Sequence, residues 1–432
     1  MSAPTGLLLK DCLLVQPSAD AAGLPRHDVL VEGNVVRRVA PAVTAPAGTR
    51  VIDCSTHVVV PGFVNTHHHF FQTLTRNLPA VQDAKLFDWL VYLYGVWRRI
   101  DAEAVTVSTQ LALAELAKTG CTCSTDHLYL YPRGSDADFT ALQFAAADAI
   151  GMRFAPCRGS MSRSRKDGGL PPDDVVQCEA DILVDSERAV RAFHDPSPLA
   201  MHRVMLAPCS PFSVSEELMK ETAALARRLG VRLHTHLAET ADENEFCLER
   251  HGVRPLARLQ RAGLLGPGFI GVHGVHLDTS EIDLLGEHRC HLAHCPTSNM
   301  KLANGAPQIA TLQAHGVGVG LGSDGAASNN RLDLFHELRH AALLAKAASE
   351  DATGLPATTV LRMATLEGAT ALGLDAEIGS LLPGKSADLC AVRLDEWILQ
   401  PCYDPASHLV YVAGREQVTH TWVAGRLRIC DG

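Results

Sequence analysis

Short apolar runs alternate with helix-like patterns through most of the chain. The runs have the length and the β-branched content of buried strands, and they lie at 231–237, 269–273, 290–294 and 317–324. Helix-like stretches follow them from about residues 242, 280 and 332. Repeated strand–helix units predict a parallel sheet, and their number favours a closed (β/α)8 barrel of the TIM type over an open sheet.

Two of the helices carry clear end signals. The apolar spacing over 103–118 predicts a helix that stops at Gly120. Ser213 followed by Glu216 forms a capping-box pattern, which predicts a helix running to about Leu229.

Both ends of the chain are rich in short strand-like pieces. The N-terminal pieces lie at 7–9, 29–31, 35–36 and 51–52, and the C-terminal ones at 389–392, 410–412 and 420–423. We expect them to meet in one small β-sandwich. The predicted domains are therefore a sandwich from residues 1–60 and 376–432, and a catalytic barrel over 61–375.

Composition excludes several classes of protein. A net charge of -10 argues against a nucleic-acid groove and against binding to an anionic membrane. No apolar run approaches the roughly 18 residues of a membrane helix. The first residues lack a basic region followed by an apolar core, and 13 cysteines are scattered through apolar runs. This pattern predicts reduced thiols in a cytoplasmic protein.

The most informative stretch is Pro-Gly-Phe-Val-Asn-Thr-His-His-His at 61–69. On an extended strand, His67 and His69 point to one side and His68 points away. Two imidazoles at a strand end suit a divalent metal, although local hydrogen bonds could also satisfy them.

Other chemistry-bearing residues also stand where apolar runs stop. His236, His273 and Asp324 end later runs, and in a barrel such strand ends meet at one face. We expect His67, His69, His236 and Asp324 to hold one divalent metal ion, zinc, with iron(II) as the alternative.

Glu239 follows His236 by three residues and is expected to act as general acid and base. A carboxylate favoured at a helix start is the other interpretation. His273 is expected to orient or polarise the water or the substrate carbonyl. Asp324 is expected to accept a proton from the nucleophile besides binding metal.

These residues resemble the amidohydrolase superfamily in its aminohydrolase branch. The matching motifs span nearly the whole chain and lie at 61–69, 236–239, 273–276 and 322–330. The resemblance implies a barrel flanked by a β-sandwich, and metal-dependent hydrolysis of C–N bonds on heteroaromatic rings. Two-metal members use a lysine on a middle strand. The run 204–209 contains none, which implies one metal.

Three residues are predicted to bind the substrate. Gln72 could pair with a lactam or amidine edge, or lie on a surface loop. Trp89 could stack on a flat ring, or belong to the core. Arg158 could donate to a carbonyl, or pair with a structural carboxylate.

The stretches 72–76, 157–173 and 207–213 resemble 8-oxoguanine deaminases. The stretches 299–303 and 399–405 are similar to adenosylhomocysteine deaminases and s-triazine hydrolases. The leading hypothesis is deamination of 8-oxoguanine to urate. The alternatives are a pterin deaminase acting on isoxanthopterin, an s-triazine amino- or chlorohydrolase, an adenosylhomocysteine-type deaminase and, outside catalysis, a structural-zinc binding protein. The expected partner is a small heterocyclic substrate. The sequence leaves open whether the chain forms a homo-oligomer.

Overall fold

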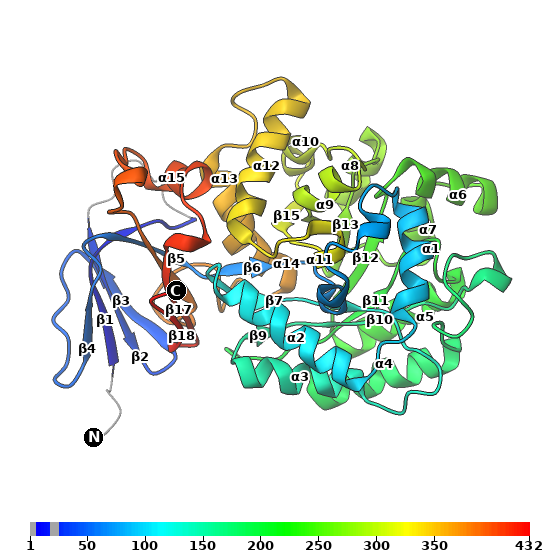
Figure 1. The fold of residues 1–432 in the computed structure, drawn as a ribbon, viewed down its shortest axis with the longest axis horizontal. Coiled ribbons are helices and arrows are strands. Elements are labelled where there is room, and N and C mark those ends of the chain that lie inside the picture. Colours follow the sequence, from blue (N-terminus) through cyan, green and yellow to red (C-terminus); the bar gives the residue numbers. More distant parts are fainter. Residues whose placement is uncertain (1–5, 18–25) are drawn as a thin grey trace.

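The computed structural model describes residues 6–17 and 26–432. A ring of parallel strands surrounded by helices lies beside a β-sheet that contains both ends of the described chain (Figure 1). This confirms the predicted (β/α)8 barrel with a smaller β-rich part from the two chain ends. The division at residues 60/61 and 375/376 stays a prediction. Residues 1–5, which bear on the expectation about a leader segment, lie outside the described residues.

The barrel strands follow one another around the ring in chain order. They are β6 (Phe63–Asn65), β7 (Cys121–Ser124) with β8 (His127–Leu128), β9 (Arg153–Phe154) with β10 (Cys157–Ser160), β11 (Met205–Pro208), β12 (Leu233–Leu237), β13 (Phe269–His273), β14 (His291–His294) and β15 (Gly318–Leu321). The ring closes where Thr66 N donates to Leu321 O at 2.9 Å, which joins the first strand to the last.

Side chains along these strands alternate between the barrel interior and the surrounding helices. Except for Met205, the strand residues of the interior cluster are small or β-branched: Val64, Cys123, Ala155, Cys157, Ala207, Ile270, Val272 and Ala293. Residues of opposite parity, such as Leu206 and Leu292, join the larger cluster that contacts the helices. This alternation decides which polar residues can reach the barrel mouth.

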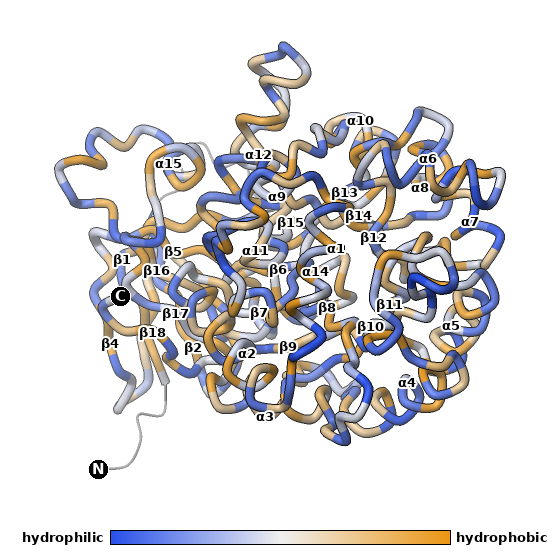
Figure 2. The backbone as a smooth tube through the Cα atoms, turned by 45° about the vertical axis from the view of Figure 1, so that its right-hand side comes forward, coloured by the Kyte–Doolittle hydropathy of each residue, from blue (hydrophilic) through white to orange (hydrophobic). Residues whose placement is uncertain are grey.

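Helices surround the ring. Their bounds are α1 (Leu86–Trp97), α2 (Ala102–Ala117), α3 (Phe139–Ile150), α4 (Glu179–Phe193), α5 (Glu216–Leu229), α6 (Ala241–His251), α7 (Pro255–Arg261), α8 (Thr279–Glu287), α9 (Pro296–Lys301), α10 (Ile309–Ala314), α11 (Ala326–Asn329), α12 (Leu334–Ser349), α13 (Ala357–Arg362) and α14 (Gly368–Leu372). Two of them, α1 and α11, contribute to the wall of the cavity at the mouth of the ring. Hydrophilic and hydrophobic residues alternate along the helices (Figure 2). In α5, for example, Leu218 and Met219 are buried while Glu217 and Lys220 are exposed. Among the described residues, no helix combines the length and the apolar character needed to cross a lipid bilayer.

The start of α5 corrects one prediction. Ser213 does not cap this helix, because Ser215 Oγ accepts the hydrogen bond from Leu218 N at 3.0 Å. The predicted end is confirmed, since Gly230 adopts the left-handed conformation that closes a helix, with φ of 69°.

The second sheet draws its strands from both chain ends. They are β1 (Gly6–Leu14), β2 (His27–Glu32), β3 (Val35–Ala40), β4 (Arg50–Asp53), β5 (His57–Pro61), β16 (Leu389–Arg393), β17 (Val418–Val423) and β18 (Arg426–Cys430). The order across the sheet is β18-β17-β16-β5-β1-β2-β3, with β4 beside β1. β5 connects through Gly62 to β6, the first barrel strand, which closely precedes His67 and His69. The terminal sheet and the predicted metal ligands are therefore joined by a short stretch of chain.

The apolar run at 410–412 is not a strand as predicted. Its first two residues are the last two of helix α15 (Pro405–Tyr411), and Val412 lies in the turn that follows. Asp404 caps the first turn of α15 by accepting from Ala406 N at 3.0 Å. Leu409 and Val410 are buried in the main core, and α15 packs against α12 and α13. A three-residue apolar run is too short to distinguish the two structures.

Candidate metal and catalytic centre

The residues predicted to share a metal lie together at the carboxyl end of the barrel strands. His67 and His69 follow β6, His236 lies in β12, and Asp324 follows β15. Asp324 Oδ1 is 3.3 Å from His67 Nε2 and 3.6 Å from His69 Nε2. His69 Nε2 and His236 Nε2 are 3.2 Å apart. Strands far apart in sequence therefore bring four donor groups to one place.

The hydrogen bonds of two imidazoles indicate a cation between them. His69 Nδ1 donates to His127 O at 2.7 Å, and His236 Nδ1 donates to Cys209 O at 2.6 Å. Burial lowers the pKa of His69 and of His236, so both rings are neutral at pH 7. Each ring then directs an Nε2 lone pair at the other, and two lone pairs cannot hydrogen-bond to one another. A divalent metal ion satisfies both.

His67 supports the same conclusion. It is fully buried, and neither of its ring nitrogens has a hydrogen-bond partner. An unpartnered buried polar atom is costly unless a ligand or ion contacts it. His68 lies between the two predicted ligands but packs against Phe70 instead. The two rings are arranged edge to face, with their centroids 4.7 Å apart. The set of three imidazoles and one carboxylate fits a divalent metal.

The backbone at three strand ends is held in the left-handed region, which is rare outside glycine. The φ angles are 48° at Ala238, 71° at His273 and 56° at Asp324. Such conformations cost free energy and persist where surrounding bonds enforce them. Two hydrogen bonds hold Asp324 in this backbone conformation. Its N donates to His67 O at 3.1 Å, and its Oδ1 accepts from Gly325 N at 2.7 Å.

Glu239 and His273 face one another beside the metal-binding groups. Glu239 Oε2 lies 3.6 Å from His273 Nε2. Burial raises the pKa of Glu239, which brings its proton affinity closer to neutral pH, as an acid–base group requires. Its N donates to Glu243 Oε2 at 2.8 Å, and burial raises the pKa of Glu243 to about 7.

One segment after β14, residues 298–304, supports three of these groups and was not predicted from sequence. Ser298 Oγ donates to Asp324 Oδ2 at 2.6 Å. Asn299 Oδ1 accepts from His273 Nδ1 at 2.9 Å, and Asn304 Nδ2 donates to Glu239 Oε1 at 2.9 Å. Polar residues in a loop and a short helix carry no periodic signal, so nothing in their pattern identified these partners.

A cavity of about 430 Å³ opens over the centre. Its walls are mostly apolar or aromatic: Leu86, Trp89, Leu90, Tyr94, Tyr129, Phe212 and Leu302. Both Gln72 and Trp89, predicted to bind substrate, line it beside Glu239 and His273. Gln72 Oε1 and Trp89 Nε1 are buried and have no hydrogen-bond partner. Two residues of the cavity wall therefore carry a buried acceptor and a buried donor without a partner in the structure.

Arg158, the third residue predicted to bind substrate, does not line this cavity. Cys157 occupies the barrel interior, so the next residue on β10 points outward to the helices. There Arg158 Nε donates to Asp185 Oδ2 at 2.9 Å, and Arg158 Nη2 donates to Gln177 Oε1 at 2.8 Å. The arginine pairs with a structural carboxylate, the alternative interpretation.

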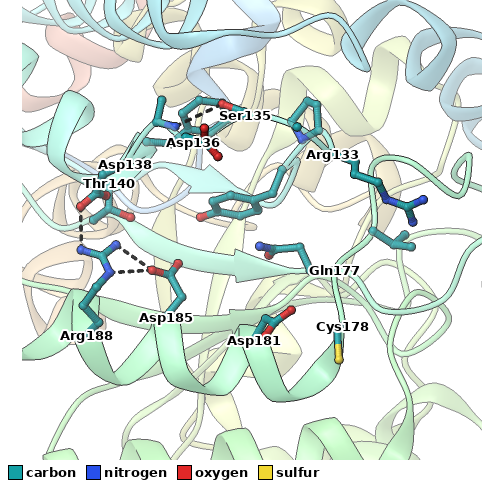
Figure 3. Close-up of a pocket in the computed structure, with 16 residues that line it drawn as sticks. Arg133, Ser135, Asp136, Asp138, Thr140, Gln177, Cys178, Asp181, Asp185 and Arg188 are labelled. Carbon is teal, nitrogen blue, oxygen red and sulfur yellow. Dashed lines mark hydrogen bonds and ion pairs between the residues drawn. The ribbon is translucent and has the colours of Figure 1, made fainter.

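A second, wider hollow of about 1270 Å³ is lined by Gln177 and Asp185, two residues that contact that arginine (Figure 3). Arg188 crosses its wall and pairs with both Asp138 and Asp185. None of the residues that line it has a buried polar atom without a partner.

Comparisons with known proteins identify the family to which this chain belongs. The model of the amidohydrolase family matches residues 58–428. The chain is 44% identical over 380 residues to an 8-oxoguanine deaminase of Pseudomonas aeruginosa, covering 88% of this chain and 84% of that protein. It is 36% identical over 432 residues to a 5-methylthioadenosine/S-adenosylhomocysteine deaminase of Moorella thermoacetica, covering 99% and 94%. The crystal structure of an adenosine deaminase from Xanthomonas campestris with bound zinc is similar with a TM-score of 0.90 and 34% identity, covering 99% and 93%.

Proposed function

The chain belongs to the amidohydrolase family and is a metal-dependent hydrolytic deaminase, and on that premise we propose that its substrate is 8-oxoguanine, which it converts to urate and ammonia. A purely structural role for the metal is set aside, since the family and its deaminase relatives identify an enzyme acting on C–N bonds.

The observation that carries the choice of a lactam-bearing ring is the unpaired pair of groups in the cavity. Gln72 Oε1 can accept from a ring N–H, and Trp89 Nε1–H can donate to a ring carbonyl. The apolar walls suit a flat heterocycle. Among such heterocycles, the relative with 44% identity favours 8-oxoguanine.

We assign His67, His69, His236 and Asp324 to one zinc ion, with iron(II) as the alternative. The relative from Xanthomonas with bound zinc supports this metal. When bound, the ion acts as a Lewis acid that makes a water molecule nucleophilic near neutral pH. Metal analysis of the purified protein tests both the element and the single equivalent at this centre.

The proton transfers follow from the positions of three side chains. Water adds to the ring carbon that bears the amino group, and the C–N bond to that group breaks. Glu239, held by Asn304, carries a proton from the water to the departing amine, which leaves as ammonia. Asp324 accepts the second proton as the new carbonyl forms, and that proton ends on the ring nitrogen. His273 orients the water or polarises the substrate carbonyl.

A direct test measures ammonia release by the zinc-loaded protein on 8-oxoguanine, guanine, isoxanthopterin, S-adenosylhomocysteine and an amino-s-triazine. Urate formation is followed by its absorbance. We expect kcat/KM for 8-oxoguanine to exceed the others by at least about tenfold, equivalent to about 1.4 kcal/mol in transition-state binding. A higher kcat/KM for another ring would replace 8-oxoguanine as the substrate. Absence of ammonia from every ring would overturn the proposal.

A further inference from the structure

A second group of metal-binding side chains lies at the end of the terminal sheet. His420 on β17 stands directly opposite Cys430 on β18, and Asp431 follows Cys430. One donor atom from each of the three lies within 4.8 Å of the others. β17 and β18 lie left of the barrel in Figure 1, whereas β12 and β13 of the catalytic centre lie on its right. The group is therefore separate from the barrel mouth.

The imidazole of His420 is held ready to bind a cation. The Thr419 hydroxyl donates to Ala391 O at 3.3 Å, so its oxygen accepts from His420 Nδ1 at 2.9 Å. This leaves the lone pair of His420 Nε2 free. The ring also stacks on Trp422, with centroids 5.2 Å apart and planes 8° apart.

The other two donors are kept beside it by the path of the backbone. Asp431 has φ of 55°, a left-handed conformation, and its Oδ2 lies 3.7 Å from Cys430 Sγ. Gly432 N donates to Thr419 O at 3.2 Å, which ties this segment back to β17. Cys430 is an exposed free thiol, so it is accessible to an ion from solution.

We propose that His420, Cys430 and Asp431 form a second metal site, specific for borderline divalent cations of the zinc class. One nitrogen, one sulfur and one oxygen suit Zn²⁺ or Co²⁺, whereas Mg²⁺ and Ca²⁺ require several oxygen ligands. Binding replaces the thiol proton of Cys430, which is released to solvent as the metal–sulfur bond forms. Water completes the coordination at the exposed side.

The surroundings predict the order in which the two sites fill. Cys430 and Asp431 are exposed to solvent, which weakens the electrostatic attraction of the site for a cation. The buried barrel centre therefore fills first, and the terminal site takes up the next equivalent.

Cobalt(II) provides a test that is independent of catalysis and of the proposed substrate. The metal-free protein is titrated with Co²⁺ while visible and near-ultraviolet spectra are recorded. We expect two equivalents to bind, the second with the charge-transfer absorption of a cobalt thiolate. Cys430→Ser and His420→Ala should each lose the second equivalent, and Cys430→Ser should lose the thiolate band. Deaminase activity of both variants should stay at the parent level.

Two control variants identify the source of the band. Cys178→Ser removes another exposed thiol, one without metal-binding neighbours in the described structure, and should change nothing. Cys209→Ser removes the thiol beside His236 in the barrel, with Cys209 Sγ 3.9 Å from His236 Nδ1, and should also keep the band. Uptake of one equivalent by the parent protein, or a band that survives Cys430→Ser, would overturn the site.

Discussion

The hollow at the barrel mouth and the hollow beside α4 have opposite character. The wider one, of about 1270 Å³, is lined by charged residues that pair with one another, such as Arg188 with Asp138 and Asp185. The narrower one, of about 430 Å³, has mostly apolar walls and keeps Gln72 Oε1 and Trp89 Nε1 unpaired. Size alone would select the wrong hollow as the active site.

Unpaired buried groups distinguish the two. Leaving a buried donor or acceptor without a partner costs about 1–3 kcal/mol, so such a group in a cavity wall is a candidate contact for a bound ligand. In the wall of the wide hollow, Gln177 Oε1 already accepts from Arg158 Nη2 at 2.8 Å. Changes to the narrow hollow should therefore alter catalysis, and changes to the wide one should alter stability.

The largest effect is expected at Glu239. Glu239→Gln keeps an oxygen for Asn304 to donate to, at the position now 2.9 Å away, but it cannot carry a proton. We expect kcat to fall by about 10²–10⁴-fold, the usual contribution of a general acid–base group. Metal content, measured by mass spectrometry, should not change. A kcat within tenfold of the parent would remove Glu239 from the proton path.

Residues at strand ends could be predicted from the sequence because polarity changes there abruptly. His236, His273 and Asp324 each end an apolar run, and barrel topology brings such ends together. Arg158 also stands in a strand, but its direction depends on the parity of β10. The sequence has a cysteine and an arginine side by side, and only packing shows that Cys157 is the inner one.

Supporting residues were harder to predict for a different reason. Ser298, Asn299 and Asn304 are small polar residues whose partners lie on other strands. Their roles are defined by tertiary contacts, and local sequence pattern carries no information about them. Tertiary contacts also explain the wrong prediction at 410–412. The apolar residues there belong to or follow α15, which is buried against α12 and α13.

A smaller effect is expected from the residue that holds Glu239. Asn304→Ala removes the hydrogen bond to Glu239 Oε1, and a bond to a charged group contributes about 1.5–3 kcal/mol. We expect kcat to fall by about 10- to 100-fold with little change in KM. Asn244→Ala is the matched control, since Asn244 is also buried but donates to His276 O at 3.2 Å. An equal loss of kcat in both variants would show a general structural effect.

The smallest effect compares the two hollows directly through a pair of glutamines. Gln72→Leu removes the unpaired acceptor of the narrow hollow, and we expect kcat/KM for 8-oxoguanine to fall about fivefold to tenfold, as for the loss of about 1 kcal/mol from one neutral hydrogen bond. Gln177→Leu removes the partner of Arg158 Nη2 in the wide hollow. It should lower the free energy of unfolding by about 1–3 kcal/mol, measured by urea denaturation, and leave kcat/KM unchanged. The opposite result, in which Gln177→Leu impaired turnover and Gln72→Leu did not, would reverse the assignment of the narrow hollow as the active site. The polar groups that contact the substrate would then lie in the wide hollow beside α4.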